Sequence, residues 1–145
     1  MLKGLIQSFE VVYFLHETED PRKVGAAVES LLSTRTGPVS EVMQGHFGNK
    51  ITRVRYHLTG AEADVALARV ADRFSARLRE ELLGKMKDII DDHSTLYLRF
   101  DKQRLVSGEL AEGYEDPVRM RVRPRAFAVK GRAGEFYSEL LAGRR

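Results

Sequence analysis

The chain contains 145 residues and carries a formal net charge of +3, with 43% hydrophobic and 31% charged residues. These proportions are typical of one soluble folded domain over residues 1–145, and they exclude an intrinsically disordered chain. Because the sequence has no cysteine, a disulfide framework, a thiolate nucleophile and a cysteine-ligated metal are excluded. A reducing, cytoplasmic setting is expected.

No membrane association is expected. The first 16 residues do not resemble a signal peptide, because Gln7, Ser8 and Glu10 interrupt their apolar run. No other segment approaches the roughly 20 apolar residues of a membrane span.

The first predicted elements are a strand and a helix. Residues 6–16 are rich in β-branched and aromatic side chains and predict a strand near the centre of a sheet. A helix is expected to begin at Pro21, because Asp20 can accept hydrogen bonds from the free N–H groups of its first turn. Apolar residues then recur at three- and four-residue steps until a Gly-Pro pair ends the helix.

The middle of the chain predicts a hairpin followed by a long helix. Two short strands, residues 39–47 and 50–58, are joined by a Gly-Asn pair that favours a tight turn. Apolar residues at helical spacing extend over residues 61–91 and predict one long amphipathic helix, with a break near Gly84.

Two more strands and a helix complete the prediction. Residues 95–101 and 116–127 alternate between apolar and polar side chains, and residues 134–145 predict a short closing helix. Strands in hairpins, combined with two or three helices, indicate an α+β domain with a largely antiparallel sheet.

Arginines alternate along the last strand, in the segment RMRVRPR of residues 119–125. Successive side chains of a strand point to opposite faces of the sheet, so these arginines share the face opposite Val118, Met120 and Val122. The strands over residues 50–58 and 95–101 repeat the pattern, with His57, Tyr97 and Asp101 beside their arginines. Six arginines are therefore expected on one face: Arg53, Arg55, Arg99, Arg119, Arg121 and Arg123.

An arginine-rich sheet face has three interpretations. Like charges directly opposite each other destabilise a sheet, which favours an anionic ligand that offsets their repulsion. A merely solvated face and a dimer interface with acidic partner residues are the alternatives. The charge distribution supports a polyanion: from Pro117 onward there are eight Lys and Arg against two Glu, whereas residues 1–116 have 16 basic and 19 acidic side chains.

Two loops offer candidate residues at the rim of this face. In GHFGNK, residues 45–50, the aromatic ring of Phe47 could stack on an unpaired base, and His46 and Lys50 could contact phosphate. Lys102 and Arg104, which follow a predicted strand, could also hold phosphate, with Asp101 orienting them or capping the next turn. In both places a solvent-exposed turn is the alternative interpretation.

No catalytic or metal-binding motif is found. The four histidines lack tight metal-ligand spacing, and neither a nucleophile elbow nor a phosphate-binding P-loop occurs. The segment HETED, residues 16–20, gathers His16, Glu17, Glu19 and Asp20, but acidic residues before a helix are favourable there without a metal. No enzyme activity, cofactor or metal is expected.

Four stretches carry a resemblance to a known family: HETEDPRKV, GHFGNKI, LYLRFDKQRLVSGEL and DPVRMRVRPRAF, in this order. Together they resemble an archaeal family described as RNA-binding proteins and predicted exosome subunits, over about residues 6–125. The resemblance implies a fold like that of the ribosomal protein that binds 5S RNA, an antiparallel sheet with helices packed on one face, and a homodimer. It implies no catalytic residues. Lys50 departs from the family pattern, which has proline at this position.

These observations lead to one main hypothesis and one alternative. The chain is expected to be a non-catalytic RNA-binding protein, associated with ribosomal components or with RNA processing and the exosome. About six phosphate contacts to single-stranded RNA would give a log–log salt slope of about −4. The alternative is a protein-interaction module, dimeric or exosome-associated, whose arginine face meets an acidic protein surface.

Overall fold

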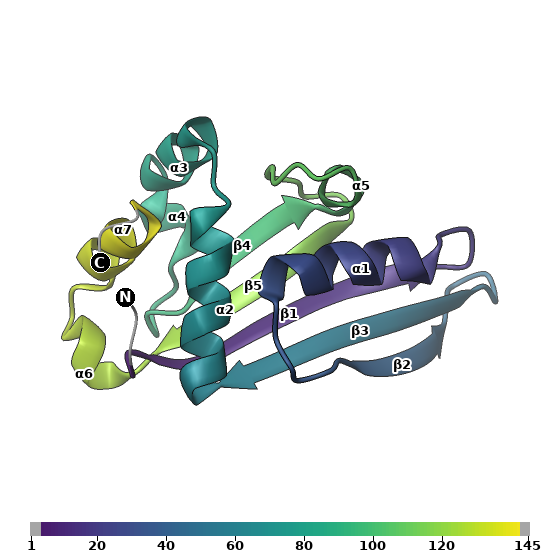
Figure 1. The fold of residues 1–145 in the computed structure, drawn as a ribbon, viewed down its shortest axis with the longest axis horizontal. Helices are drawn as coiled ribbons and strands as arrows, with labels where there is room; N and C mark the ends of the chain where they lie inside the picture. The colour runs from purple at the N-terminus through teal and green to yellow at the C-terminus, as the bar shows by residue number, and fades with distance from the viewer. Residues whose placement is uncertain (1–3, 143–145) are drawn as a thin grey trace.

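A five-stranded antiparallel sheet forms the centre of the computed structural model, which describes residues 4–142 (Figure 1). The strand order is β2-β3-β1-β5-β4, so the long N-terminal strand is central, as the sequence predicts. The strands are β1 (Ile6–His16), β2 (Val39–Gln44), β3 (Lys50–Thr59), β4 (Leu96–Asp101) and β5 (Pro117–Pro124).

Helices cover one face of this sheet. The α1 and α2 helices lie across β1 and β3, α5 lies beside α1, and the remaining helices gather beyond one end of the sheet (Figure 1). The helices are α1 (Pro21–Leu32), α2 (Gly60–Asp72), α3 (Ala76–Leu83), α4 (Met86–Ile89), α5 (Lys102–Val106), α6 (Ala126–Val129) and α7 (Ala133–Leu141). Among the described residues, no helix is long and apolar enough to cross a membrane.

The hydrophobic core lies between the sheet and these helices. Phe9, Val11 and Tyr13 of β1 are almost completely buried, and alternate residues of β3, β4 and β5 join them. The burial pattern therefore follows the alternation of side chains expected for strands with one covered face. The fold class predicted from the sequence, α+β with an antiparallel sheet, is confirmed.

The prediction of one long helix over residues 61–91 is wrong, because three helices occupy this segment. The expected break near Gly84 is present, but a second break follows Asp72. There the Ser75 hydroxyl accepts a hydrogen bond from Leu78 N at 3.0 Å and starts α3. Phe74, in the connection, is only 5% exposed. Because Phe74 is a core residue although it lies in the connection, the helical spacing of apolar residues continues across the connection. The sequence pattern therefore does not reveal that one helix ends there.

The connection between β2 and β3 is longer than predicted. It spans residues 45–49, where Gly45 N donates to Asn49 O at 2.6 Å, and β2 ends at Gln44. Gly48 has a φ of +81°, which favours glycine. A five-residue loop thus replaces the two-residue turn.

Candidate nucleic-acid interface

The face of the sheet opposite α1 and α2 is here called the open face. Its side chains alternate with the core residues along each strand, so Glu10, Val12 and Phe14 of β1 lie on it. The structure places all six predicted arginines there: Arg53 and Arg55 on β3, Arg99 on β4, and Arg119, Arg121 and Arg123 on β5.

The arginines form two lines, one on each side of β1. Val12 is directly opposite Arg55 on one side and Arg119 on the other. Arg119 is in turn directly opposite Arg99 on β4. We call the arginines of β3 the first arginine line and those of β4 and β5 the second. The direct opposition of two guanidinium groups is unfavourable for the isolated sheet.

Glu10 stands between the two lines and neutralises one arginine from each. Its carboxylate accepts hydrogen bonds from Arg55 Nε at 2.7 Å and from Arg121 Nη2 at 3.0 Å, and His57 Nδ1 lies 3.8 Å away. Burial raises the pKa of the Glu10 carboxyl, but the Arg55 hydrogen bond and the nearby positive charges outweigh it and lower the pKa overall. Glu10 is therefore ionised at neutral pH.

The other four arginines of the open face form no ion pair within residues 4–142. These are Arg53, Arg99, Arg119 and Arg123. Glu41 of β2 is directly opposite Arg53 in the ladder, yet their charged groups are not within ion-pairing distance. Arg99, Arg119 and Arg123 are exposed to solvent. Within residues 4–142, their positive charge is thus not balanced by an ion pair.

A shallow hollow of about 250 Å³ lies on the open face above β1, β4 and β5. The half-buried side chains of Val12 and Phe14 contribute its apolar part, and arginines of both lines border it. Tyr97 also lines it, and its hydroxyl donates a hydrogen bond to Asp91 Oδ2 at 2.9 Å. This bond, together with burial, raises the pKa of Tyr97 and keeps the phenol neutral.

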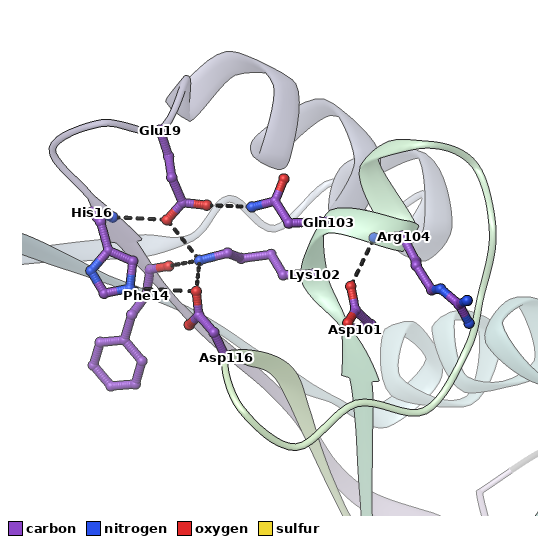
Figure 2. Close-up of polar contacts among 8 residues, drawn as sticks. All are labelled: Phe14, His16, Glu19, Asp101, Lys102, Gln103, Arg104 and Asp116. Atoms are coloured by element: carbon purple, nitrogen blue, oxygen red, sulfur yellow. Dashed lines mark hydrogen bonds and ion pairs between the residues drawn. The ribbon is translucent and has the colours of Figure 1, made fainter.

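Lys102 does not lie at the rim, contrary to the sequence prediction. Its side chain is 1% exposed, and its ammonium donates to Phe14 O at 2.6 Å, Glu19 Oε1 at 2.8 Å and Asp116 Oδ2 at 2.6 Å (Figure 2). All three donors of the ammonium are thereby used. A phosphate contact by Lys102 would require this buried network to open, so the predicted role is corrected to a structural one.

The ammonium of Lys102 binds the backbone of β1 just beyond its ladder with β5. The pairs of β1 and β5 end with Val12 opposite Arg119, two residues before Phe14. From α5, Lys102 donates to the Phe14 carbonyl at 2.6 Å. The ammonium thus fixes the backbone of a residue whose ring lies on the open face.

The same network contains the candidate cation site suggested by HETED. The potential ligand atoms of His16, Glu19 and Asp116 lie within 4.8 Å of one another. The Lys102 ammonium already lies between the two carboxylates, at 2.8 Å and 2.6 Å. A metal ion would have to displace it, so the observed geometry favours an internal ion pair over a metal site.

Arg104 also lies away from the open face. Arg104 is on α5, beside α1, and its guanidinium pairs with Glu109 at 3.4 Å. Its backbone N–H donates to Asp101 Oδ1, so Asp101 caps α5, one of the two roles predicted for it. At the β2–β3 loop, Phe47 is 92% exposed and packs edge-on against His46, with Lys50 exposed beside them.

Residues 8–123 match the family described as RNA binding. The chain belongs to this RNA-binding family. Among proteins of the family, RNA-binding protein PAB1135 of Pyrococcus abyssi is 35% identical over 136 residues, which cover 83% of this chain and 82% of that protein.

Solved structures from archaea share the fold of this RNA-binding family member. Protein AF2318 from Archaeoglobus fulgidus is 27% identical with a TM-score of 0.78, covering 93% of this chain and 99% of that one. Protein SSO0741 from Sulfolobus solfataricus is 26% identical with a TM-score of 0.76, covering 93% and 98%. Both are described as DUF54 proteins.

Glu10 and Phe14 are the residues of the open face that sequence reasoning missed. Both occur in residues 6–16, whose composition predicts a central strand but not which residues lie on each face. A signal was present: Glu10, Val12 and Phe14 alternate with the core residues Phe9, Val11 and Tyr13. The alternation is concealed because two of the three outward residues are apolar.

Proposed function

We propose that this protein is a non-catalytic RNA-binding protein and that the open face is its RNA-binding surface. The observation that carries the proposal is the gathering of six arginines from three strands on one face, four of them without an ion-pair partner among the described residues. Membership of the RNA-binding family and the similarity to an RNA-binding protein of Pyrococcus abyssi support it.

The charges of the open face suggest what the ligand must provide. Arg99 and Arg119 repel each other across β4 and β5, and phosphate oxygens would offset this repulsion through charge-assisted hydrogen bonds. Because Glu10 neutralises Arg55 and Arg121, the four unpaired arginines set the expected salt dependence. For single-stranded RNA, four contacts give a log–log slope of about −3, shallower than the value of about −4 expected for six.

The test compares two double variants that remove the same charge. Arg119→Gln with Arg123→Gln changes the open face, and Arg22→Gln with Arg69→Gln changes exposed arginines of α1 and α2. Loss of two contacts is expected to weaken RNA binding about ten-fold at 0.15 M salt and to reduce the slope by about 1.4. Equal losses in the two variants would show that overall charge, not the open face, holds the RNA.

The absence of catalysis and the cellular partners are further parts of the proposal. Incubation of the protein with labelled RNA and Mg²⁺ or Mn²⁺ is expected to leave the RNA intact. An association with ribosomal components or with RNA processing and the exosome rests on the family resemblance, and the cytoplasmic location rests on the absence of cysteine. Crosslinking in cells, followed by sequencing of the attached RNA, would identify the ligand, and recovery of no specific RNA would count against this role.

A second candidate function is self-association through β2. The β4 edge of the sheet is partly covered, because Asp101 N donates to Ala111 O at 2.8 Å and Gly113 N donates to Arg99 O at 3.2 Å. In contrast, within the described part of the chain β2 has a strand on one side only, and its Val39 and Val42 are 69% and 66% exposed. An unprotected, weakly charged edge strand of this kind pairs readily with another strand.

We propose that β2 pairs with β2 of a second copy around a two-fold axis at Val42. This register puts Val42 opposite Val42 and Glu41 opposite Met43, whereas an axis at Glu41 would oppose two carboxylates. The two open faces would then form one continuous surface.

Sedimentation velocity is expected to show a dimer. Val42→Lys is expected to dissociate this dimer, whereas Val65→Lys, on the exposed surface of α2, is expected to leave it intact. If instead changing Arg119, Arg121 and Arg123 to Gln produced monomers, the open face would be the protein interface.

A further inference from the structure

The middle of the open face differs chemically from its borders. Neighbouring strands lie about 4.8 Å apart, so the arginines of β3 and those of β5 face each other across a strip about 10 Å wide. The strip itself is β1, which presents the side chains of Glu10, Val12 and Phe14. Guanidinium groups bind phosphate, but a carboxylate repels it and apolar groups make no favourable contact with it. A ligand that fills this surface must therefore bring something other than phosphate to its middle.

We propose that the open face binds single-stranded RNA, with one unpaired nucleobase lying on Val12 and Phe14 while the phosphates follow the arginine lines. This inference rests on the proposed function and specifies the class of RNA and the seat of a base. It assigns a role to Val12 and Phe14 of β1, which are apolar and do not bind phosphate.

The hollow on the open face is a suitable binding site for one nucleobase. Its volume of about 250 Å³ is bordered by Arg99 and Arg119 on one side and by Arg53 on the other, with Phe14 contributing an aromatic surface. Stacking of a base on an aromatic ring is independent of sequence because every base has a π-face. The nearby guanidinium groups can add cation–π contacts to the same base.

The backbone that carries the Phe14 ring is held in place before any ligand arrives. Lys102 holds the Phe14 carbonyl at 2.6 Å (Figure 2). The ladder with β3 holds Phe14 opposite Arg53. On the far side of the hollow, Tyr97 is held by Asp91 at 2.9 Å. Such preorganisation reduces the entropy lost when a base is bound.

Glu10 repels phosphates from this base-binding site. Its side chain is only 12% exposed, and it remains charged because two arginines donate to it. A phosphate over β1 would lie close to this carboxylate, whereas phosphates over β3 or β5 lie beside unpaired guanidinium groups. The charge pattern thus favours a backbone along the borders and bases toward the middle.

A double helix fits this pattern poorly. In A-form RNA the bases are already stacked inside, and the wide minor groove presents polar hydroxyl groups that gain nothing from an apolar strip. A paired base would reach Phe14 only after leaving its stack, which costs a few kcal/mol. A single strand has no such requirement, since its bases are free to turn toward the ring.

The experiment measures dissociation constants by fluorescence anisotropy with three labelled probes that have equal numbers of phosphates. They are an oligouridylate of a dozen nucleotides, the same chain without bases, and an RNA duplex. Each is titrated with the wild type and with Phe14→Leu, which keeps an apolar side chain but removes the ring. Phe14→Tyr keeps the ring and serves as the conservative control. Urea unfolding of each variant verifies that it is folded.

The wild type is expected to bind the oligouridylate more tightly than the other two probes. Phe14→Leu is expected to weaken oligouridylate binding about ten-fold, the loss of one stacked base, without changing the salt slope or the affinity for the chain without bases. Phe14→Tyr is expected to bind like the wild type. Two results would overturn the inference, provided that the arginine variants still bind RNA more weakly than the wild type. One is that the duplex binds as tightly as the single strand, and the other is that Phe14→Leu does not change the affinity for the oligouridylate. If no probe binds in a salt-dependent manner, the proposed function fails as well.

Discussion

Replacement of Lys102 by Met tests whether the buried ammonium holds β1, β5 and α5 together. Methionine has a similar length and fills the space of the aliphatic stem, so the change removes the charge without leaving a large cavity. Three acceptors lose their donor: the Phe14 carbonyl and the carboxylates of Glu19 and Asp116. The matched control is Lys23→Met, which removes the same charge from an exposed position on α1.

The expected loss of stability follows from the burial of these groups. Breaking a fully buried ion pair costs about 3–5 kcal/mol, and an unsatisfied buried carbonyl costs about 1–3 kcal/mol. Asp116 is 42% exposed, so water can replace part of what its carboxylate loses, whereas Glu19 is only 13% exposed. We therefore expect Lys102→Met to lower the free energy of unfolding by about 3 kcal/mol. With a urea m-value of about 2 kcal/mol/M, the unfolding midpoint moves down by about 1.5 M.

The pH dependence of stability gives a second measurement on the same variant. Burial raises the pKa of Glu19, but its hydrogen bonds, first of all from Lys102, outweigh this and lower the pKa below the usual 4.5. A lowered folded-state pKa contributes stability above about pH 4.5, and this contribution is lost as the pH falls through the folded pKa. Lys102→Met is expected to remove much of this acid sensitivity. A urea midpoint equal to that of Lys23→Met, with an unchanged pH profile, would refute the structural role of the ammonium.

Three further outcomes are expected from urea unfolding. Gly113→Ala should destabilise the protein by about 1–3 kcal/mol, because the new Cβ would lie 2.7 Å from Asp101 Cα, whereas Gly134→Ala, with nothing within 4 Å, should be neutral or stabilising. Ser75→Ala should lower the free energy of unfolding by about 1 kcal/mol, since it removes the side-chain cap of α3. Thr59→Ala should lower it less, because Thr59 makes no side-chain cap bond to α2. Equal losses in the two variants would contradict the capping argument. Glu10→Gln should reduce the fall in stability below about pH 4.5, because the lowered pKa of Glu10 contributes stability only above that range; an unchanged profile would argue against the bridge to Arg55 and Arg121.

The positions of the arginines could be predicted because they depend on a local rule. Side chains of a strand alternate between faces, so the strand containing Arg119, Arg121 and Arg123 must show all three to one side. The central place of residues 6–16 followed equally from composition, since a strand so rich in β-branched and aromatic side chains is favoured in the middle of a sheet. Local patterns thus fixed which side chains share a face, although they did not identify the contacts between them.

The contacts that the sequence did not reveal join residues far apart in the chain. Glu10 meets Arg121, and Lys102 meets Glu19, across separations of 111 and 83 positions. A lysine beside polar residues at the end of a strand has the same local pattern whether it is exposed or buried. The packing of α5 against α1, with acceptors at Phe14, Glu19 and Asp116, decides that Lys102 is buried.

These long-range contacts change how the charges of the open face are counted. By sequence, six arginines are equivalent, and each should hold one phosphate. In the structure, Glu10 pairs with Arg55 and Arg121, one from each arginine line. The unpaired guanidinium groups of Arg53 and Arg119 remain on the two strands beside Val12 and Phe14. The carboxylate therefore does more than subtract charge: it divides a uniform basic surface into two cationic borders and an uncharged strip at Val12 and Phe14. A face with six free arginines would attract phosphate everywhere along β1, whereas this division gives bases and backbone different places to bind.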